Sequence, residues 1–181
     1  MKVLIAIGLL IFGLMPAGLG GDFDLGQWGT LSMEVPAGWS VTRKEVTLGG
    51  VQDVTLILEA PSGVKAKCII EHYTAKPVTL NPAHARKTMA AATRELVSKK
   101  VEIKDFSLKT GYGAYGIFAV TDIALKKTEW EDFRFVGRGL VEFNTLHNAG
   151  ITLLMNDPGG PECKAMVRVV NSLRLSEGKP K

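Results

Sequence analysis

The sequence predicts an α+β fold in which helices pack on a central antiparallel sheet of about seven to eight strands, as an α/β/α sandwich. Three observations support this prediction. Short stretches of alternating polar and apolar residues recur along the chain, separated by turns that contain Pro and Gly. Two other stretches have the apolar spacing of amphipathic helices. The order is strands, helix, strands, helix, and without strand–helix alternation a parallel sheet is not expected.

The first four predicted strands lie close together in the chain, at 30–35, 39–46, 53–60 and 64–74. In the first of them Leu31 and Met33 alternate with polar residues, which is typical of a strand with one buried face. The turns between the strands contain Pro36-Ala37-Gly38, Gly49-Gly50 and Pro61-Ser62-Gly63. Tight turns at this spacing predict that the four strands form one antiparallel meander.

An amphipathic helix is predicted next. Asn81 is a favourable N-cap and Pro82 is favoured at the first helical position. Ala85, Met89 and Leu96 then recur at helical spacing, which indicates a helix of about five turns through residue 100.

Extended structure is predicted again at 101–108, 117–125, 133–143 and 151–155, with Asn148-Ala149-Gly150 as the hairpin turn before the last strand. A closing helix begins near Pro161. Its apolar residues have the spacing of a helical stripe that must pack against the sheet, and they are Cys163, Met166, Val167, Val170 and Leu173.

The two ends of the chain are predicted to differ from this domain. Lys2 precedes an uninterrupted apolar run over residues 3–15, and Pro16 and small residues up to Gly20 follow, the layout of a secretory signal peptide. We therefore expect residues 1–20 to be a signal peptide cleaved near Gly20, with an uncleaved anchor as the alternative. Residues 21–28 are a lead, 29–175 one α+β domain and 176–181 a disordered tail. The mature protein is expected to be periplasmic or secreted.

Composition and charge exclude some classes of partner. The 181 residues carry a formal net charge of +4, which falls to +3 when Lys2 is removed. Basic residues occur as isolated pairs, such as Lys99-Lys100 and Lys126-Lys127, and do not form the clustered positive field of a nucleic-acid-binding protein. We expect no nucleic-acid partner and no stable membrane insertion after signal cleavage.

The stretch GYGAYG, residues 111–116, matches the G-x-G-x-x-G pattern of dinucleotide-binding proteins. In that fingerprint the glycines end a strand and open a helix whose N-terminus receives the phosphates. Here IFAVTDIAL follows, and its β-branched and aromatic residues favour a strand. We interpret the stretch as a glycine-rich strand start or hairpin, and expect no bound cofactor.

The sequence contains no established catalytic or metal-binding motif. The three histidines, His72, His84 and His147, lack the spacing of a metal pair, and no catalytic residue is assigned. His72, Tyr112 and Tyr115 are the candidate residues for a ligand groove.

Cys68 and Cys163 are the two cysteines of the chain. Both are predicted to face the interface between the helix and the sheet in an oxidising compartment, so they could form one disulfide. Because bridging requires α-carbons within about 7 Å, two separate buried thiols are the alternative.

MEVPAGWSV (33–41), FRFVGRGLVEF (133–143), ITLLM (151–155) and VVNSLRL (169–175) together resemble the PsbP-like superfamily. This group includes the extrinsic subunit of photosystem II, a Ran-binding nuclear import factor and many exported bacterial proteins of unknown role. The resemblance covers about residues 29–175, and it implies an antiparallel sheet between helices with no shared catalytic residue.

These observations together predict an exported, non-catalytic binding or assembly module that acts through an envelope or secreted protein partner. The alternative is a secreted small-ligand binder or enzyme whose pocket includes His72 and the tyrosines of GYGAYG.

Overall fold

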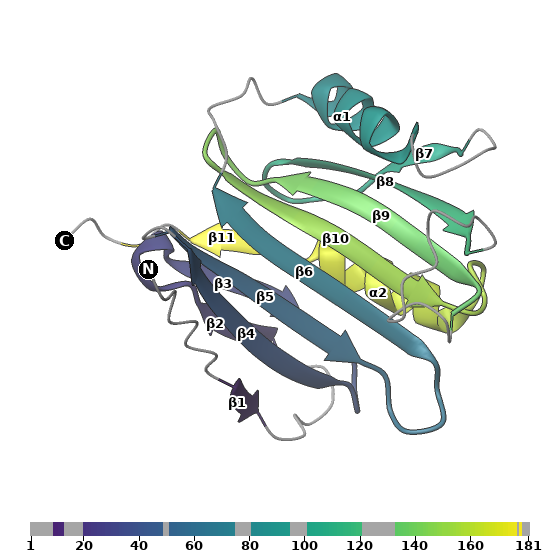
Figure 1. Ribbon diagram of the computed structural model, residues 1–181, viewed down its shortest axis with the longest axis horizontal. Coiled ribbons are helices and arrows are strands. Elements are labelled where there is room, and N and C mark those ends of the chain that lie inside the picture. Colours follow the sequence, from purple (N-terminus) through teal and green to yellow (C-terminus); the bar gives the residue numbers. More distant parts are fainter. Residues whose placement is uncertain are drawn as a thin grey trace, which may run out of the picture.

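The computed structural model describes residues 9–12, 20–48, 51–74, 81–94, 101–120, 133–176 and 178. Within these ranges, two α-helices and one short 3-10 helix accompany strands that form two antiparallel sheets (Figure 1). The predicted α+β fold with one large antiparallel sheet is therefore confirmed.

The larger sheet has eight strands in the order β1-β4-β5-β6-β10-β9-β8-β7. They are β1 (Leu9–Phe12), β4 (Ser40–Leu48), β5 (Val51–Glu59), β6 (Ala66–Thr74), β10 (His147–Met155), β9 (Phe135–Glu142), β8 (Tyr112–Ala119) and β7 (Ile103–Asp105). At its centre β6 pairs with β10, where Ile70 is opposite Ile151. The sheet thus joins the N-terminal and C-terminal halves of the chain.

The smaller sheet has the order β11-β3-β2 and consists of β11 (Arg174–Ser176), β3 (Thr30–Glu34) and β2 (Gly20–Asp24). The prediction of one four-strand meander is corrected here, because β3 belongs to this second sheet and only β4, β5 and β6 form the meander. The turn at Gly38, whose φ is +76°, carries the chain from one sheet to the other. Alternation in β3 shows that one face is buried, but it does not identify the neighbouring strand.

The ends of the chain differ in part from the sequence-based expectation. The predicted lead forms β2 and the 3-10 helix η1 (Gly26–Trp28). β11 was not predicted, and its last residue, Ser176, is the first residue of the expected tail. Of the predicted signal peptide, residues 1–8 and 13–19 lie outside the described residues, as do 177 and 179–181 of the tail.

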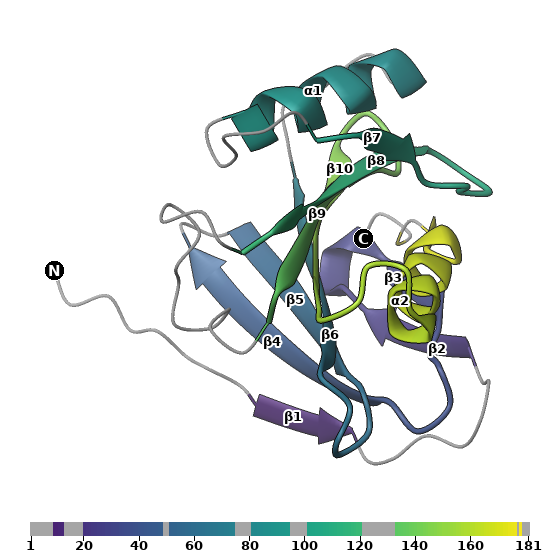
Figure 2. The same cartoon turned by 90° about the vertical axis from the view of Figure 1, so that its right-hand side faces the viewer.

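One face of the large sheet is buried beneath α2 (Pro161–Asn171) and the small sheet, as Figure 2 shows. From α2, Cys163, Met166, Val169 and Val170 are buried there. The helix was predicted correctly from Pro161, although Val169 replaces Val167 in the buried stripe. The sheet contributes alternate residues of its central strands, including Leu56, Leu58, Cys68, Ile70, Ile151 and Leu153, none more than 1% exposed.

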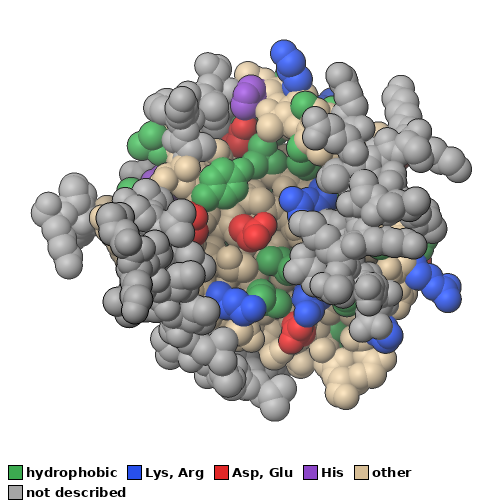
Figure 3. Space-filling model, viewed as in Figure 1, with side chains coloured by type: hydrophobic (Ala, Val, Ile, Leu, Met, Phe, Trp, Pro, Cys, Tyr) green, Lys and Arg blue, Asp and Glu red, His purple; other side chains and the backbone are tan. Residues whose placement is uncertain are grey.

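The opposite face, which we call the open face, is covered differently. Among the described helices, α1 (Pro82–Arg94) packs on it, at one end, where Ala85 and Met89 lie over Ala114 and Leu140. In Figure 3 the described part of this face is hollowed, and hydrophobic, acidic and basic side chains lie beside one another there. The predicted helix start at Asn81-Pro82 is confirmed, while residues 95–100 of the predicted helix lie outside the described residues.

The hairpin turn before β10 is another correction. β10 begins at His147, so Asn148, Ala149 and Gly150 are strand residues. The side chain of Asn144 makes the turn instead, because its Oδ1 accepts hydrogen bonds from the backbone N–H groups of Leu146 (2.9 Å) and His147 (2.8 Å). β8 likewise begins earlier than predicted, at Tyr112, and residues 121–125 of the predicted strand are outside the described part.

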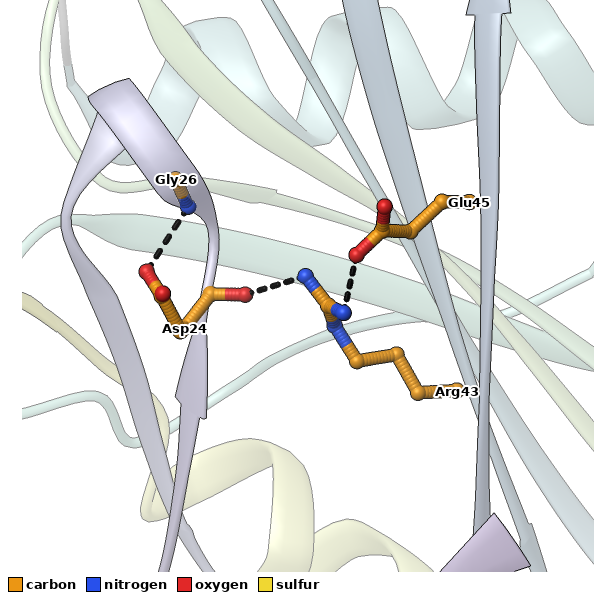
Figure 4. Close-up of polar contacts among 4 residues, drawn as sticks. All are labelled: Asp24, Gly26, Arg43 and Glu45. Carbon is orange, nitrogen blue, oxygen red and sulfur yellow. Dashed lines mark hydrogen bonds and ion pairs between the residues drawn. The ribbon is translucent and has the colours of Figure 1, made fainter. Parts of the chain in front are cut away.

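Arg43 links the two sheets (Figure 4). It lies on β4, donates a hydrogen bond of 2.6 Å from Nη2 to the backbone carbonyl of Asp24 at the end of β2, and forms an ion pair with Glu45. Asp24 Oδ1 in turn accepts from the backbone N–H of Gly26 at 2.8 Å. These contacts hold the start of η1 against β4 of the large sheet.

Candidate functional site

On β5 and β6 the open face is less buried than the opposite face, whereas on β9 and β10 Val136 and Leu154 of the open face are fully buried. On β6, Cys68, Ile70 and His72 are at most 1% exposed, whereas Ile69 and Tyr73 are half-buried and Glu71 is exposed. The same difference holds on β5, where Leu56 and Leu58 are buried and Thr55 and Ile57 are half-buried. This face therefore offers both apolar and charged side chains to a ligand.

Four polar side chains form one row across the open face. Tyr73, Asn148, Glu142 and Tyr112 occupy paired positions on β6, β10, β9 and β8. The first turn of α1 lies over this row, and His84 Nδ1 is 2.7 Å from Glu142 Oε1. Asn81 Oδ1, which accepts from the backbone N–H of His84 at 2.8 Å, fixes this turn of the helix. Glu142 is 1% exposed and Asn148 is 5% exposed, so the middle of the row is enclosed.

Two acceptor atoms in this row have no hydrogen-bond partner in the described part of the chain. They are Oε2 of Glu142 and Oδ1 of Asn148. A buried acceptor without a partner is costly, because it has lost its hydrogen bonds to water. The row is thus a place where a donor group of a ligand or a water would be stabilised.

Gly150 leaves space next to this row. A Cβ atom built on it would lie 3.6 Å from Glu71 Oε2 and 3.8 Å from Tyr73 Cε1, both ordinary contact distances. Burial and the carboxylates of Glu142 and Glu71 raise the pKa of Tyr73, while Arg138 acts in the opposite direction. Carboxylates therefore dominate the electrostatic field around this tyrosine.

Arg138 also lies on the open face, opposite Thr152, which is two residues beyond Gly150 on β10. Its Nη1 donates a hydrogen bond of 2.7 Å to Thr152 Oγ1 on the neighbouring strand. This contact holds the guanidinium group near Gly150, where it forms no ion pair with Glu142 within the described residues.

A second polar cluster, of His72, His147 and Trp28, lies on the opposite face of the sheet. The two imidazole rings stack with centroids 5.4 Å apart, and His72 Nε2 is 3.2 Å from His147 Nδ1. Trp28 from η1 meets His147 edge-on, also at 5.4 Å. Burial, and secondly His147, lower the pKa of His72 from 6.5 to about 4. His72 is thus a neutral core residue at neutral pH.

This lowered pKa predicts that acid destabilises the protein before most carboxylates titrate. Below pH 6.5 the unfolded chain binds a proton at His72 that the folded chain does not bind until about pH 4. Stability is therefore fully present above pH 6.5, and by linkage it should fall by about 2 kcal/mol between pH 7 and pH 5. Urea unfolding at the two pH values measures this, and His72→Gln should lose most of the pH dependence. Equal pH dependence in both proteins would contradict the prediction.

A pocket of about 540 Å³ lies between β7, β8 and the start of α2. Tyr115 and Ile117 form part of its apolar wall, and Tyr115 stacks on Phe106 with ring centroids 4.5 Å apart. The lining also contains three basic side chains, and no acidic one: the residues are Lys104, Tyr115, Ile117, Pro158, Pro161, Cys163, Lys164, Val167 and Arg168.

The structure does not bring the three predicted groove residues together. Tyr112 and Tyr115 are three residues apart on β8, so they point to opposite faces of the sheet. Tyr112 ends the polar row of the open face, whereas Tyr115 lines the pocket beside α2. His72 is on the face of Tyr115 but on β6, three strands away in the order β6-β10-β9-β8, about 14 Å at the usual strand spacing.

Cys68 and Cys163 face the same helix–sheet interface, as expected, but they are two free buried thiols. Cys163 lines the pocket with residues of β8, whereas Cys68 lies on β6, three strands from β8. Burial raises the pKa of the Cys68 thiol to about 12.

GYGAYG leads into β8, which begins at its second residue, Tyr112, as the residues after it suggested. Its glycines are explained by close packing in the sheet. A Cβ on Gly113 would lie 2.9 Å from the carbonyl oxygen of Leu140, and one on Gly116 would lie 2.7 Å from Val101 Cγ1.

Sequence reasoning missed the polar row. Glu142 lies in the stretch 133–143 that was predicted as a strand, but Asn148 was assigned to a turn, and His84 and Tyr73 are distant in sequence from both. The alternation of β10 extended back to His147 was the signal that could have placed Asn148 on a strand.

Among the residues described, no group of three or more His, Cys, Asp or Glu side chains is arranged to hold a metal ion. In the same part of the chain no helix is long and apolar enough to span a bilayer. In the comparisons with known proteins, no family model, no curated protein and no solved structure matches the chain.

Proposed function

We propose that the protein is an exported, non-catalytic binding module that holds a protein partner against the open face of its large sheet. The observation that carries the proposal is the unequal burial of the two faces of β5 and β6. One face is sealed by α2 and the small sheet, whereas Ile57, Ile69 and Tyr73 on the other remain half-buried. Half-buried apolar and aromatic side chains among charged ones are typical of protein-binding surfaces.

The charges on the open face favour a polar partner surface with apolar contacts at its centre. Lys67 pairs with Glu59 at 2.6 Å, and Arg138 is held by Thr152. Glu71 is exposed and none of the ion pairs found in the described residues includes it. Specific recognition can thus use this carboxylate at the rim, where charge steers association.

The His84–Glu142 pair has the form of an acid–base pair, but the proposal gives it a structural role. In the described residues, His84 makes no hydrogen bond to a serine, threonine or cysteine side chain that could act as a nucleophile. The pair instead attaches the first turn of α1 to β9. Export is proposed from the sequence of residues 1–20, and membership of the PsbP-like superfamily from the four segments that resemble it.

A small-ligand binder is the second candidate function, and the pocket beside Tyr115 favours it. Its volume of about 540 Å³ lies in the usual range of ligand sites. Apolar walls with Lys104, Lys164 and Arg168 would suit a small amphipathic anion.

Site-specific photo-crosslinking in the host cell tests the protein-partner proposal. A photoreactive residue at Ile57 or Ile69 should form an adduct with one partner protein, because both positions lie on the open face. The same residue at Val64, a 41% exposed position in the β5–β6 turn, is the control and should form none. Adducts at Val64 only, or at all three positions equally, would contradict the proposal. Native mass spectrometry of the purified protein that showed a bound small molecule and no adduct would favour the second candidate.

A further inference from the structure

The two residues that carry the unpartnered acceptors of the polar row are neighbours in the sheet. Asn148 and Glu142 are register partners on β10 and β9, and both project onto the open face. Side chains at such paired positions have Cβ atoms about 5 Å apart. Oε2 of Glu142 and Oδ1 of Asn148 are both fully shielded from solvent and both lack a donor. One donor group placed between them would satisfy both atoms.

The chemistry of the surroundings favours a cationic donor. A carboxylate oxygen and an amide oxygen can only accept hydrogen bonds, so with the oxygen of Asn148 turned toward Glu142 a group that donates two would satisfy both atoms. Glu71 adds a second carboxylate nearby, and the two carboxylates together outweigh Arg138 in their effect on Tyr73. The ring of Tyr73 also provides a face against which a cation is stabilised. A protonated amine or a guanidinium group meets all of these requirements.

Gly150 provides the entrance to this place. It is two residues from Asn148 on β10 and therefore on the same face of the sheet. The space where its side chain would lie is bordered by Glu71 Oε2 and Tyr73 Cε1 at 3.6 and 3.8 Å. Gly150 is itself half-buried, so this space lies at the border between the enclosed row and solvent.

We propose that Glu142 and Asn148 form a subsite for one lysine or arginine side chain of the partner polypeptide, which enters over Gly150 beside Tyr73. The proposal rests on the proposed function, because it names the residue type by which the partner docks on the open face. A long basic side chain suits the geometry, since its aliphatic stem can lie along Ile69 and Tyr73 while its charged end reaches the buried acceptors.

Nuclear magnetic resonance of the isotope-labelled chain, purified in the form that the cell produces, tests the subsite. The probes are a blocked pentapeptide with one central lysine, the same peptide with norleucine, and n-butylammonium. The lysine peptide should shift the backbone signal of Gly150 and the side-chain amide signal of Asn148 in a saturable manner. The norleucine peptide should not shift these signals. n-Butylammonium should bind at least about tenfold more weakly than the lysine peptide, a difference of about 1.4 kcal/mol.

Two variants and their controls locate the binding. Glu142→Gln removes the charge but keeps an oxygen for His84. It should lower the affinity for the lysine peptide at least about tenfold, or by about 1.4 kcal/mol. Glu102→Gln is the matched control on a 79% exposed side chain and should leave binding unchanged. Gly150→Ala should also weaken binding, because its methyl group fills the entrance at ordinary contact distances and so preserves the fold. Gly159→Ala, at an exposed position, is its control.

The outcomes separate this inference from the proposed function. Three results would overturn the subsite: equal signal shifts with the lysine and norleucine peptides, no shifts with either, or unchanged binding of the lysine peptide to both Glu142→Gln and Gly150→Ala. A buried water would then remain as the partner of the two acceptors. If n-butylammonium binds as tightly as the lysine peptide, the proposal that the cation belongs to a polypeptide is overturned. If the subsite fails while the photo-crosslink at Ile69 persists in Glu142→Gln, the docking face stands without it.

Discussion

Replacement of Leu153 by alanine should lower the free energy of unfolding by about 3–5 kcal/mol. Leu153 is 0% exposed and lies in the main core on β10, between Cys68 on one neighbouring strand and Gly137 on the other. A Cβ on Gly137 would be only 3.0 Å from Leu153 Cβ and 3.2 Å from its Cδ1, so the leucine covers the glycine. Because Gly137 has no side chain to move into the space, the cavity left by alanine cannot be refilled from that side.

Urea unfolding of the wild type and the variant measures this loss, with the slope against denaturant compared in the two proteins. Leu146→Ala is the matched control, since Leu146 is 47% exposed in the turn before β10 and its truncation should change stability by no more than about 0.5 kcal/mol. A loss below about 1 kcal/mol in Leu153→Ala would show that this part of the core is packed differently.

Gly111→Ala should destabilise the protein by about 2–5 kcal/mol, the sum of backbone strain and overpacking. Gly111 precedes β8 with φ of +79°, a conformation that residues with a side chain rarely adopt. A Cβ there would lie 2.2 Å from the backbone oxygen of Glu142 and 3.1 Å from the Cα of Phe143. These are backbone atoms of a paired strand, so they cannot move aside as the end of a flexible side chain can.

Gly63→Ala separates the two costs. Gly63 has φ of +89°, but a Cβ on it would have no neighbour within 4 Å. We expect this variant to lose only the strain, about 1–2 kcal/mol. Thermal or urea unfolding of both variants tests the comparison, and equal losses would contradict the close approach of Gly111 to Glu142.

The two tyrosines of GYGAYG show what sequence reasoning could have found and did not. The groove prediction required the stretch to place Tyr112 and Tyr115 together with His72, although the stretch was interpreted as a strand start or hairpin. As a strand it cannot, because residues an odd number apart project to opposite faces. Asn148 illustrates the same limit at the other end of the site. Asn, Ala and Gly in succession are typical of a turn, yet Asn144 makes the turn and leaves these three in β10.

By itself, the sequence determined the local elements of this protein. The period of two marked β3 to β6 and β9, the Asn81-Pro82 pair marked the start of α1, and the apolar stripe after Pro161 marked α2. These features depend on side chains only a few residues apart, so the pattern is visible without a partner.

Only the tertiary structure decided which strands pair and in which register. β3 has the alternation of β4 and β5 but belongs to another sheet, and nothing local distinguishes them. Glu142 and Asn148 become neighbours, and His84 comes to lie over Glu142, through pairing and packing between distant segments. The physical reason is that alternation specifies which face of a strand is buried, whereas its neighbour is chosen by the packing of the whole core.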